Sequence, residues 1–259
     1  MWITAGAEGV TMIQLPPSFV TALRTLTALP VWGRESGSFT GSLPYFSSVG
    51  LVIGAGQYLA ALLLLPVFPP VILAPLLIAY HLLITRAFHL DGLADMADGF
   101  GGGWTKERIS EIMKDSRVGA FGAISVAALL LVRNGGTVYV LQRNLILYLL
   151  YIPMLSRTSL VFTTRVFPYA FEEGLAAQII NGAKWHHFLF NLLPIIVLTL
   201  IISPDAYVNI LALFAVSTAS QIAVGRKSMK KISGISGDIL GASLEISEAL
   251  MYTFMAVLA

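Results

Sequence analysis

The sequence predicts an all-α integral membrane protein, a polytopic helical bundle of about seven transmembrane helices with an interfacial helix near the N-terminus. Of its 259 residues, 56% are hydrophobic and only 12% are charged, and the mean hydropathy is +0.80. Soluble domains carry about a quarter charged residues, so the apolar excess must face lipid. Cysteine is absent, which excludes disulfides, thiolate metal sites and cysteine nucleophiles. The composition also excludes a nucleic-acid-binding protein.

The first 42 residues contain no clear membrane span. Apolar residues from Phe19 to Leu26 recur at helical spacing and predict one short amphipathic helix, which would lie at the membrane interface or pack on the bundle. The start of the chain lacks the basic region, apolar core and cleavage site of a signal peptide, so we expect it to be retained.

Seven later stretches approach or reach the roughly 17–25 residues that cross a bilayer. They cover residues 45–66, 70–88, 118–132, 144–162, 187–203, 207–223 and 239–258. Together with the first 42 residues, they predict a single transmembrane catalytic domain over residues 1–259.

The distribution of Lys and Arg predicts the orientation, because short cytoplasmic loops collect positive charge. On this map twelve of the sixteen Lys and Arg lie on the side of the N-terminus, and only Arg133 and Arg143 lie on the other side. We therefore expect a multi-pass protein of the cytoplasmic (inner) membrane whose N-terminus faces the cytoplasm. Most carboxylates share that side, so we expect the active site to face the cytoplasm too.

The most informative segment is the acidic run after the second span, within residues 89–117. Asp91, Asp95 and Asp98 recur at i, i+4 and i+7, a spacing that places three carboxylates on one helix face. Like charges this close favour a bound cation, and oxygen ligands alone suit Mg²⁺, Mn²⁺ or Ca²⁺. A solvated acidic face is the alternative, but carboxylates at a membrane boundary are costly and usually functional.

A second charged element follows, in which Asp115 lies between Lys114 and Arg117 and glycines open the next span. The two cations suit phosphate oxygens, while Asp115 could complete a metal site or take a proton. Snorkelling side chains of an ordinary surface segment are the alternative.

The third element is a basic loop rich in Gly and Ser, predicted over residues 225–238, which contains Ser236 and Asp238 and leads into the last span. Backbone amides at the start of a helix bind anions, so we expect an anion site here, with a flexible positive loop as the alternative. Further along this span, Glu245 and Glu248 share a stripe with Asp238 and should face the bundle interior, as should Arg157. No role is assigned to His81, His186 or His187.

Three strings resemble signature segments of the cobalamin synthase (adenosylcobinamide-GDP ribazoletransferase) family: FHLDGLADMADG at 88–99, EIMKDSRVGAFG at 111–122 and GISGDILGA at 234–242. Shorter matches at 26–30, 46–54 and 155–157 extend the resemblance over nearly the whole chain. The clearest departure is at Ser233-Gly234, where a glycine pair is expected.

The resemblance implies that the protein joins adenosylcobinamide-GDP to alpha-ribazole, or to its 5′-phosphate, releasing GMP with Mg²⁺ as cofactor. In our hypothesis the metal is held by Asp91, Asp95, Asp98 and Asp115 and bridges the diphosphate of the corrinoid substrate. Asp115 or His89 is the candidate catalytic base. The candidate substrate-binding residues are Lys114, Arg117, Arg157, Ser236 and Asp238. The lipid bilayer is the other expected partner, and the sequence leaves a homo-oligomer open.

Two other functions remain open. The spaced aspartates loosely resemble those of CDP-alcohol phosphotransferases, although the AspGly-x-x-AlaArg core of those enzymes is absent. A cation transporter could use the same carboxylates, but it predicts acidic residues in mid-span, and only Glu245 and Glu248 meet that expectation.

Overall fold

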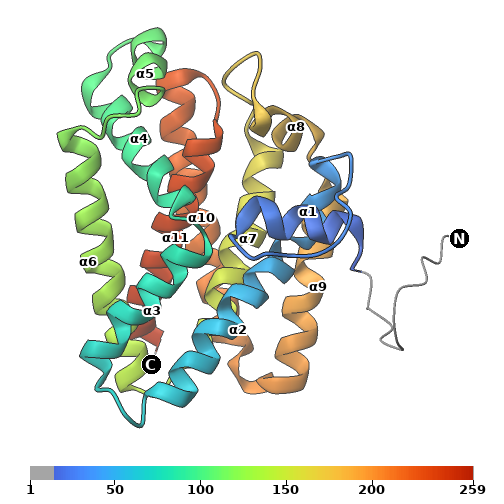
Figure 1. Ribbon diagram of the computed structural model, residues 1–259, viewed down its shortest axis with the longest axis vertical. Helices are drawn as coiled ribbons and strands as arrows, with labels where there is room; N and C mark the ends of the chain where they lie inside the picture. The colour runs from blue at the N-terminus through green and yellow to red at the C-terminus, as the bar shows by residue number, and fades with distance from the viewer. Residues whose placement is uncertain (1–14, 259) are drawn as a thin grey trace, which may run out of the picture.

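The structure, a computed structural model, describes residues 15–258, and this part of the chain is a bundle of helices (Figure 1). The helices are α1 (Pro17–Leu26), η1 (Thr40–Tyr45), α2 (Phe46–Leu64), α3 (Pro70–Ile84), α4 (Phe88–Gly102), α5 (Lys106–Met113), α6 (Ala120–Gln142), α7 (Tyr148–Val166), α8 (Leu175–Gly182), α9 (Trp185–Ile202), η2 (Pro204–Ala206), α10 (Tyr207–Ile232) and α11 (Gly237–Leu258). The predicted all-α class is confirmed.

Each of the seven apolar stretches overlaps one helix of 15–26 residues: α2, α3, α6, α7, α9, α10 and α11. The predicted N-terminal amphipathic helix is α1, which runs across the bundle rather than along it (Figure 1). It buries Val20, Leu23 and Leu26 and packs on η1 and α2. The first fourteen residues of the predicted interfacial segment lie outside the described residues.

Four helical stretches of the described chain are long and apolar enough to cross a membrane: Thr40–Leu64, Ala120–Gln142, Trp185–Ile202 and Pro204–Ile232. A fifth results if α3 and α4, which meet at 90°, count as one broken span. Helices α7 and α11 carry charges, yet their 19 and 22 residues extend over about 28 and 33 Å at 1.5 Å per residue. A total of seven spans stays a prediction.

Helices α7 and α11 form the inside of the bundle. Helix α7 packs on α2, α9, α10 and α11, and α11 packs on α4, α6, α7 and α10. The outer helices instead turn apolar side chains outward, among them Leu131 of α6, Leu200 of α9 and Leu211 of α10. Polar side chains of α7 and α11 are thereby separated from lipid.

Two predicted boundaries are wrong. Helix α6 continues to Gln142, so Arg133 is a buried residue within a helix and does not belong to the loop side of the membrane. In this stretch Gly136 lets α6 lie against the backbone of α11 at Tyr252, which a Cβ atom would overlap. Helix α10 continues to Ile232, so residues 225–232 of the predicted basic loop are helical and only residues 233–236 connect α10 to α11.

Candidate functional site

The site begins where α4 lies against the start of α11. A Cβ atom on Gly92 would overlap the backbone of Asp238, so glycine at this position permits the contact. Further along the same interface, Gly241 packs on the backbone of His89. The two approaches bring the acidic face of α4 beside the N-terminus of α11.

A pocket of about 1070 Å³ opens beside this contact, between α1, α4, α5, α6, α11 and the segment that follows α7. Asp91, His89 and Asp238 line it, as do Ser236 and Lys114. Its other charged lining residues are Arg24, Glu35, Arg86 and Glu173. Apolar and aromatic side chains complete the wall, including Phe88, Phe171, Leu160 and Leu240. Anionic and cationic groups therefore face one largely apolar cavity.

Asp98 has a structural partner, the N-terminus of α6. The amide of Gly119 donates to Asp98 Oδ2 at 2.7 Å, and the amide of Gly122 donates to Oδ1 at 2.8 Å. A Cβ atom on either glycine would collide with this carboxylate. Asp98 thus satisfies amides that the first turn of a helix leaves without partners and ties α4 to α6.

Asp115 is paired with Arg117 in the turn between α5 and α6. The side chain of Arg117 donates to both carboxylate oxygens, with Nη2 2.6 Å from Oδ2, and its backbone amide donates to Oδ1 at 3.0 Å. These hydrogen bonds lower the pKa of Asp115 to about 2. A carboxylate with so low a pKa is a weak proton acceptor at neutral pH.

The predicted metal ligands are therefore not gathered at one point. Asp91 faces the pocket, Asp95 lies one turn further along α4, Asp98 caps α6 and Asp115 pairs with Arg117. Within residues 15–258 no three His, Asp or Glu side chains are placed to hold a metal ion together. Mg²⁺ does not need such a cage, because it is usually held by one or two carboxylates plus substrate phosphates and water. Asp91 and Asp95 fit that pattern.

Ser236 acts as the N-cap of α11. Its Oγ accepts from the amide of Ile239 at 3.3 Å, and the residues before it pair with the segment after α7, where the amide of Ala170 donates to the carbonyl of Ile235 at 2.9 Å. Nearby, Lys114 Nζ lies 5.8 Å from the centre of the Phe171 ring. The cap and the cation thus flank the pocket from two elements.

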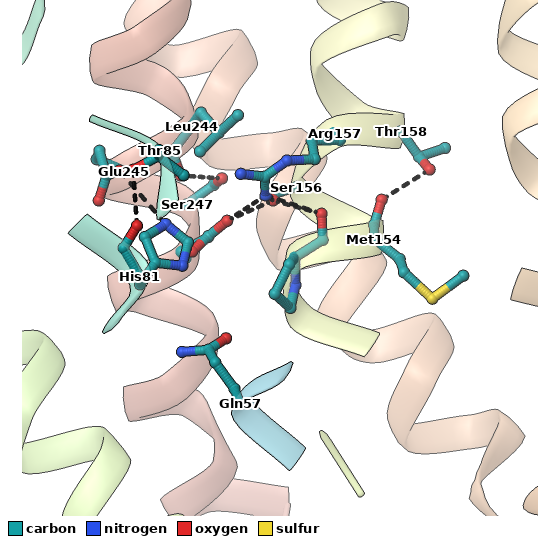
Figure 2. Close-up of polar contacts among 12 residues, drawn as sticks. Gln57, His81, Thr85, Met154, Ser156, Arg157, Thr158, Leu244, Glu245 and Ser247 are labelled. Carbon is teal, nitrogen blue, oxygen red and sulfur yellow. Dashed lines mark hydrogen bonds and ion pairs between the residues drawn. The ribbon is translucent and has the colours of Figure 1, made fainter. Parts of the chain in front are cut away.

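A cluster of buried charges lies deeper in the bundle. It comprises His81, Arg133, Arg157, Glu245 and Glu248, all with fully buried side chains, and we call it the interior ion cluster. Figure 2 shows that His81 of α3 and Arg157 of α7 approach α11 from different sides. The prediction that Glu245, Glu248 and Arg157 face inward is confirmed.

The interior ion cluster adjoins the pocket on the side of the bundle interior. Thr85, which lines the pocket, donates to the carbonyl of His81 at 2.8 Å, and Glu245 follows the lining residue Gly241 by one helical turn. Arg157, a predicted phosphate ligand, donates to Glu248 Oε1 at 2.7 Å and to the carbonyl of Pro153 at 3.0 Å. Its guanidinium is thus held within the bundle.

The structure adds four residues to the predicted site: Arg24, Arg86, Tyr169 and Phe171 all line the pocket. Arg86 stands out because it and Ala87 adopt left-handed backbone conformations, with φ of 56° and 51°. Such strain tends to mark functional sites. The sequence carried one signal for Arg86, its place at the end of a span directly before the acidic run. Arg117, by contrast, is 86% exposed and does not line the pocket.

Comparison with known proteins identifies relatives along the whole chain. Adenosylcobinamide-GDP ribazoletransferase of Chlorobaculum tepidum is 38% identical over 239 residues, which are 92% of this chain and 94% of the relative. The enzyme of the same name from Syntrophobacter fumaroxidans is 36% identical over 259 residues and 99% of both chains. No solved structure matches. The sequence model of cobalamin-5-phosphate synthase matches residues 18–256, and the chain belongs to that family.

Proposed function

We propose that the pocket beside α4 and α11 is where this adenosylcobinamide-GDP ribazoletransferase of cobalamin synthesis carries out its reaction. The hydroxyl of alpha-ribazole, or of its 5′-phosphate, would attack the phosphorus attached to cobinamide, and GMP would leave with the bridging oxygen. The observation that carries this assignment is the placement of Asp91, His89 and Lys114 on one cavity of about 1070 Å³. Its apolar wall suits a large organic substrate, and its charged groups suit a diphosphate.

Mg²⁺ is the proposed cofactor, with Asp91 and Asp95 as its protein ligands. Bound there, it would offset the charge of the diphosphate and of the departing phosphate. Asp98 and Asp115 are less suited, because amides of α6 and the guanidinium of Arg117 already occupy their oxygens. Two carboxylates remain, which is the number of protein ligands that a typical Mg²⁺ site has beside phosphates and water.

The other residues would bind and orient the substrates. Lys114, which follows α5, and Arg86, between α3 and α4, would neutralise phosphate oxygens. His89 would accept the proton of the attacking hydroxyl, because it is one of the residues that line the pocket. Asp238 would bind substrate at the start of α11, where Ser236 caps the helix.

We further propose that the pocket faces the cytoplasm from the inner membrane. The count of Lys and Arg supports this orientation more strongly once Arg133 is placed inside α6, since thirteen cations, including Arg86, then lie on the pocket side and Arg143 alone lies opposite. Labelling of a cysteine introduced at Lys106 by an impermeant reagent in intact cells and in inverted vesicles would test it. Labelling only in inverted vesicles is the expected result.

The direct test is GMP release by detergent-purified protein given adenosylcobinamide-GDP and alpha-ribazole. We expect release only with both substrates and Mg²⁺, and its loss in EDTA. Asp91→Asn should abolish release, whereas Glu107→Gln, a matched change of an exposed carboxylate outside the pocket, should not. Full activity of Asp91→Asn, or full activity in EDTA, would show that the metal assignment is wrong.

A further inference from the structure

A second pocket, of about 670 Å³, opens where α7 ends and α9 begins. Its lining comes from the last turn of α7, the end of α8 and the first residue of α9, and includes Arg165, Lys184 and Trp185. None of these residues belongs to the pocket beside α4 and α11. The second pocket is therefore separate from the pocket beside α4 and α11.

The two cations of this pocket lack anionic partners in the described part of the chain. Neither Arg165 nor Lys184 forms an ion pair with any Asp or Glu there. The guanidinium of Arg165 instead lies 5.3 Å from the centre of the Trp185 ring, and that ring packs on Phe162 at 5.8 Å. Aromatic packing thus positions a guanidinium whose N–H groups remain available to an external acceptor.

The second pocket lies at one end of a helix that is long enough to cross a membrane. Trp185 is the first residue of α9, an apolar helix long enough to cross a membrane, and Leu189 and Leu193 of the same helix are exposed. Tryptophan and cations at the end of a membrane-spanning helix lie at the level of the lipid headgroups. Arg165 and Lys184 are therefore placed where phosphates of lipids are concentrated.

We propose that this pocket binds the phosphate of an anionic phospholipid. Basic pockets between membrane helices bind anionic headgroups, and a guanidinium donates two parallel hydrogen bonds to phosphate. The positive end of the α9 helix dipole adds to the attraction. The acyl chains would continue along the exposed apolar face of α9.

A lipid bound here would touch the segment that leads into the transferase pocket. Pro168 lines the second pocket, and the next residue, Tyr169, lines the first. The amide of Ile235 donates to the carbonyl of Pro168 at 2.9 Å, which ties the same segment to the connection before α11. A bound headgroup would thus stabilise one wall of the transferase pocket. This would make the reaction depend on the membrane.

The test is native mass spectrometry of the full-length protein titrated with phosphatidylglycerol or with phosphatidylcholine. We expect the wild type to retain phosphatidylglycerol preferentially, and Arg165→Gln and Lys184→Gln each to weaken that binding about fivefold. Arg143→Gln is the matched control, because Arg143 also lies over an aromatic ring, 5.6 Å from the centre of Tyr139, but outside this pocket. It should bind phosphatidylglycerol as the wild type does.

Three results would overturn the assignment. The first is unchanged phosphatidylglycerol binding by both pocket variants, and the second is an equal loss in Arg143→Gln, which would indicate general surface charge. The third is displacement of phosphatidylglycerol from the wild type by millimolar inorganic phosphate, which would identify a soluble anion as the ligand. Lipid binding is measured without substrates, so this outcome is independent of the transferase assay.

Discussion

Arg133 of α6 and Glu245 of α11 are 112 residues apart in the chain and meet inside the bundle, where Arg133 Nη1 donates to Glu245 Oε2 at 2.8 Å. Nη2 of the same arginine donates to Glu248 at 2.8 Å, and Glu248 also accepts from Arg157. Two arginines thus balance two glutamates, so the interior ion cluster holds three helices together without net charge from these four residues.

This balance predicts non-additive effects of neutralising mutations. Glu245→Gln or Arg133→Met alone leaves one buried charge uncompensated, and each should lower the free energy of unfolding by about 3–5 kcal/mol. The double variant keeps Arg157 opposite Glu248 and should lose less than either single variant. Thermal unfolding of the purified proteins measures all three.

The exposed pair Arg108–Glu111, 2.7 Å apart on α5, provides the control for this cycle. Neutralising either member, or both, should change stability by about 1 kcal/mol or less, because water screens an exposed pair. A double variant of Arg133 and Glu245 whose loss equals the sum of the two single losses would contradict the role of charge balance.

The aspartates of α4 should separate into two kinds on mutation. Asp98→Asn removes one of the two carboxylate oxygens that accept amides of α6, and we expect a loss of about 1 kcal/mol in stability. The side chain of Asp91 makes no hydrogen bond to a described residue, and Asp91 lines the pocket, so Asp91→Asn should keep its unfolding temperature and lose GMP release. Equal unfolding temperatures for the two variants would contradict the capping role of Asp98.

The helices and their inward faces could be predicted from the sequence because local patterns determine them. The i, i+4, i+7 spacing placed Asp91, Asp95 and Asp98 on one face of α4, and the cost of charge in lipid turned Glu245 inward. The partners of these residues could not be predicted in the same way. That Asp98 caps α6 depends on how two helices pack, which no local pattern encodes.

The helix boundary near Arg133 also could not be predicted from the local sequence. The predicted span ends at residue 132, and the glycines that follow Arg133, Gly135 and Gly136, are typical of a helix end in a soluble protein. In the bundle Gly136 is a contact point with α11, a frequent role of small residues between membrane helices. The partner helix therefore decides whether such a glycine ends a helix or continues it.

Gly92 should be sensitive to substitution, because it sets the distance between α4 and α11. Gly92→Ala would push a methyl group into the backbone of Asp238, with a cost of about 1–3 kcal/mol and a loss of GMP release. Gly135→Ala is the control, since nothing lies near its Cβ position. It should raise stability by up to about 1 kcal/mol, and both variants can be compared by thermal unfolding and GMP release.

At the turn between α3 and α4, one substitution should raise stability and weaken substrate binding. Arg86 has φ of 56° and lines the pocket, and a left-handed conformation costs a non-glycine residue about 1–2 kcal/mol. Glycine removes that cost but loses about 0.5–1 kcal/mol of conformational entropy on folding. Arg86→Gly should therefore gain up to about 1 kcal/mol in stability while the KM for adenosylcobinamide-GDP rises, because a phosphate ligand is lost.

Asn144 provides the matched control at the turn between α6 and α7, with φ of 53° and no place in the lining of the pocket. Asn144→Gly changes a second left-handed position, one that asparagine already tolerates, so it should leave the unfolding temperature, kcat and KM nearly unchanged. If Arg86→Gly also left KM unchanged, Arg86 would not be a phosphate ligand, and the strained turn would serve only to redirect the chain from α3 into α4. A higher KM in Arg86→Gly alone would show that the Arg86 side chain contributes to substrate binding, since glycine at a left-handed turn position is common to both variants.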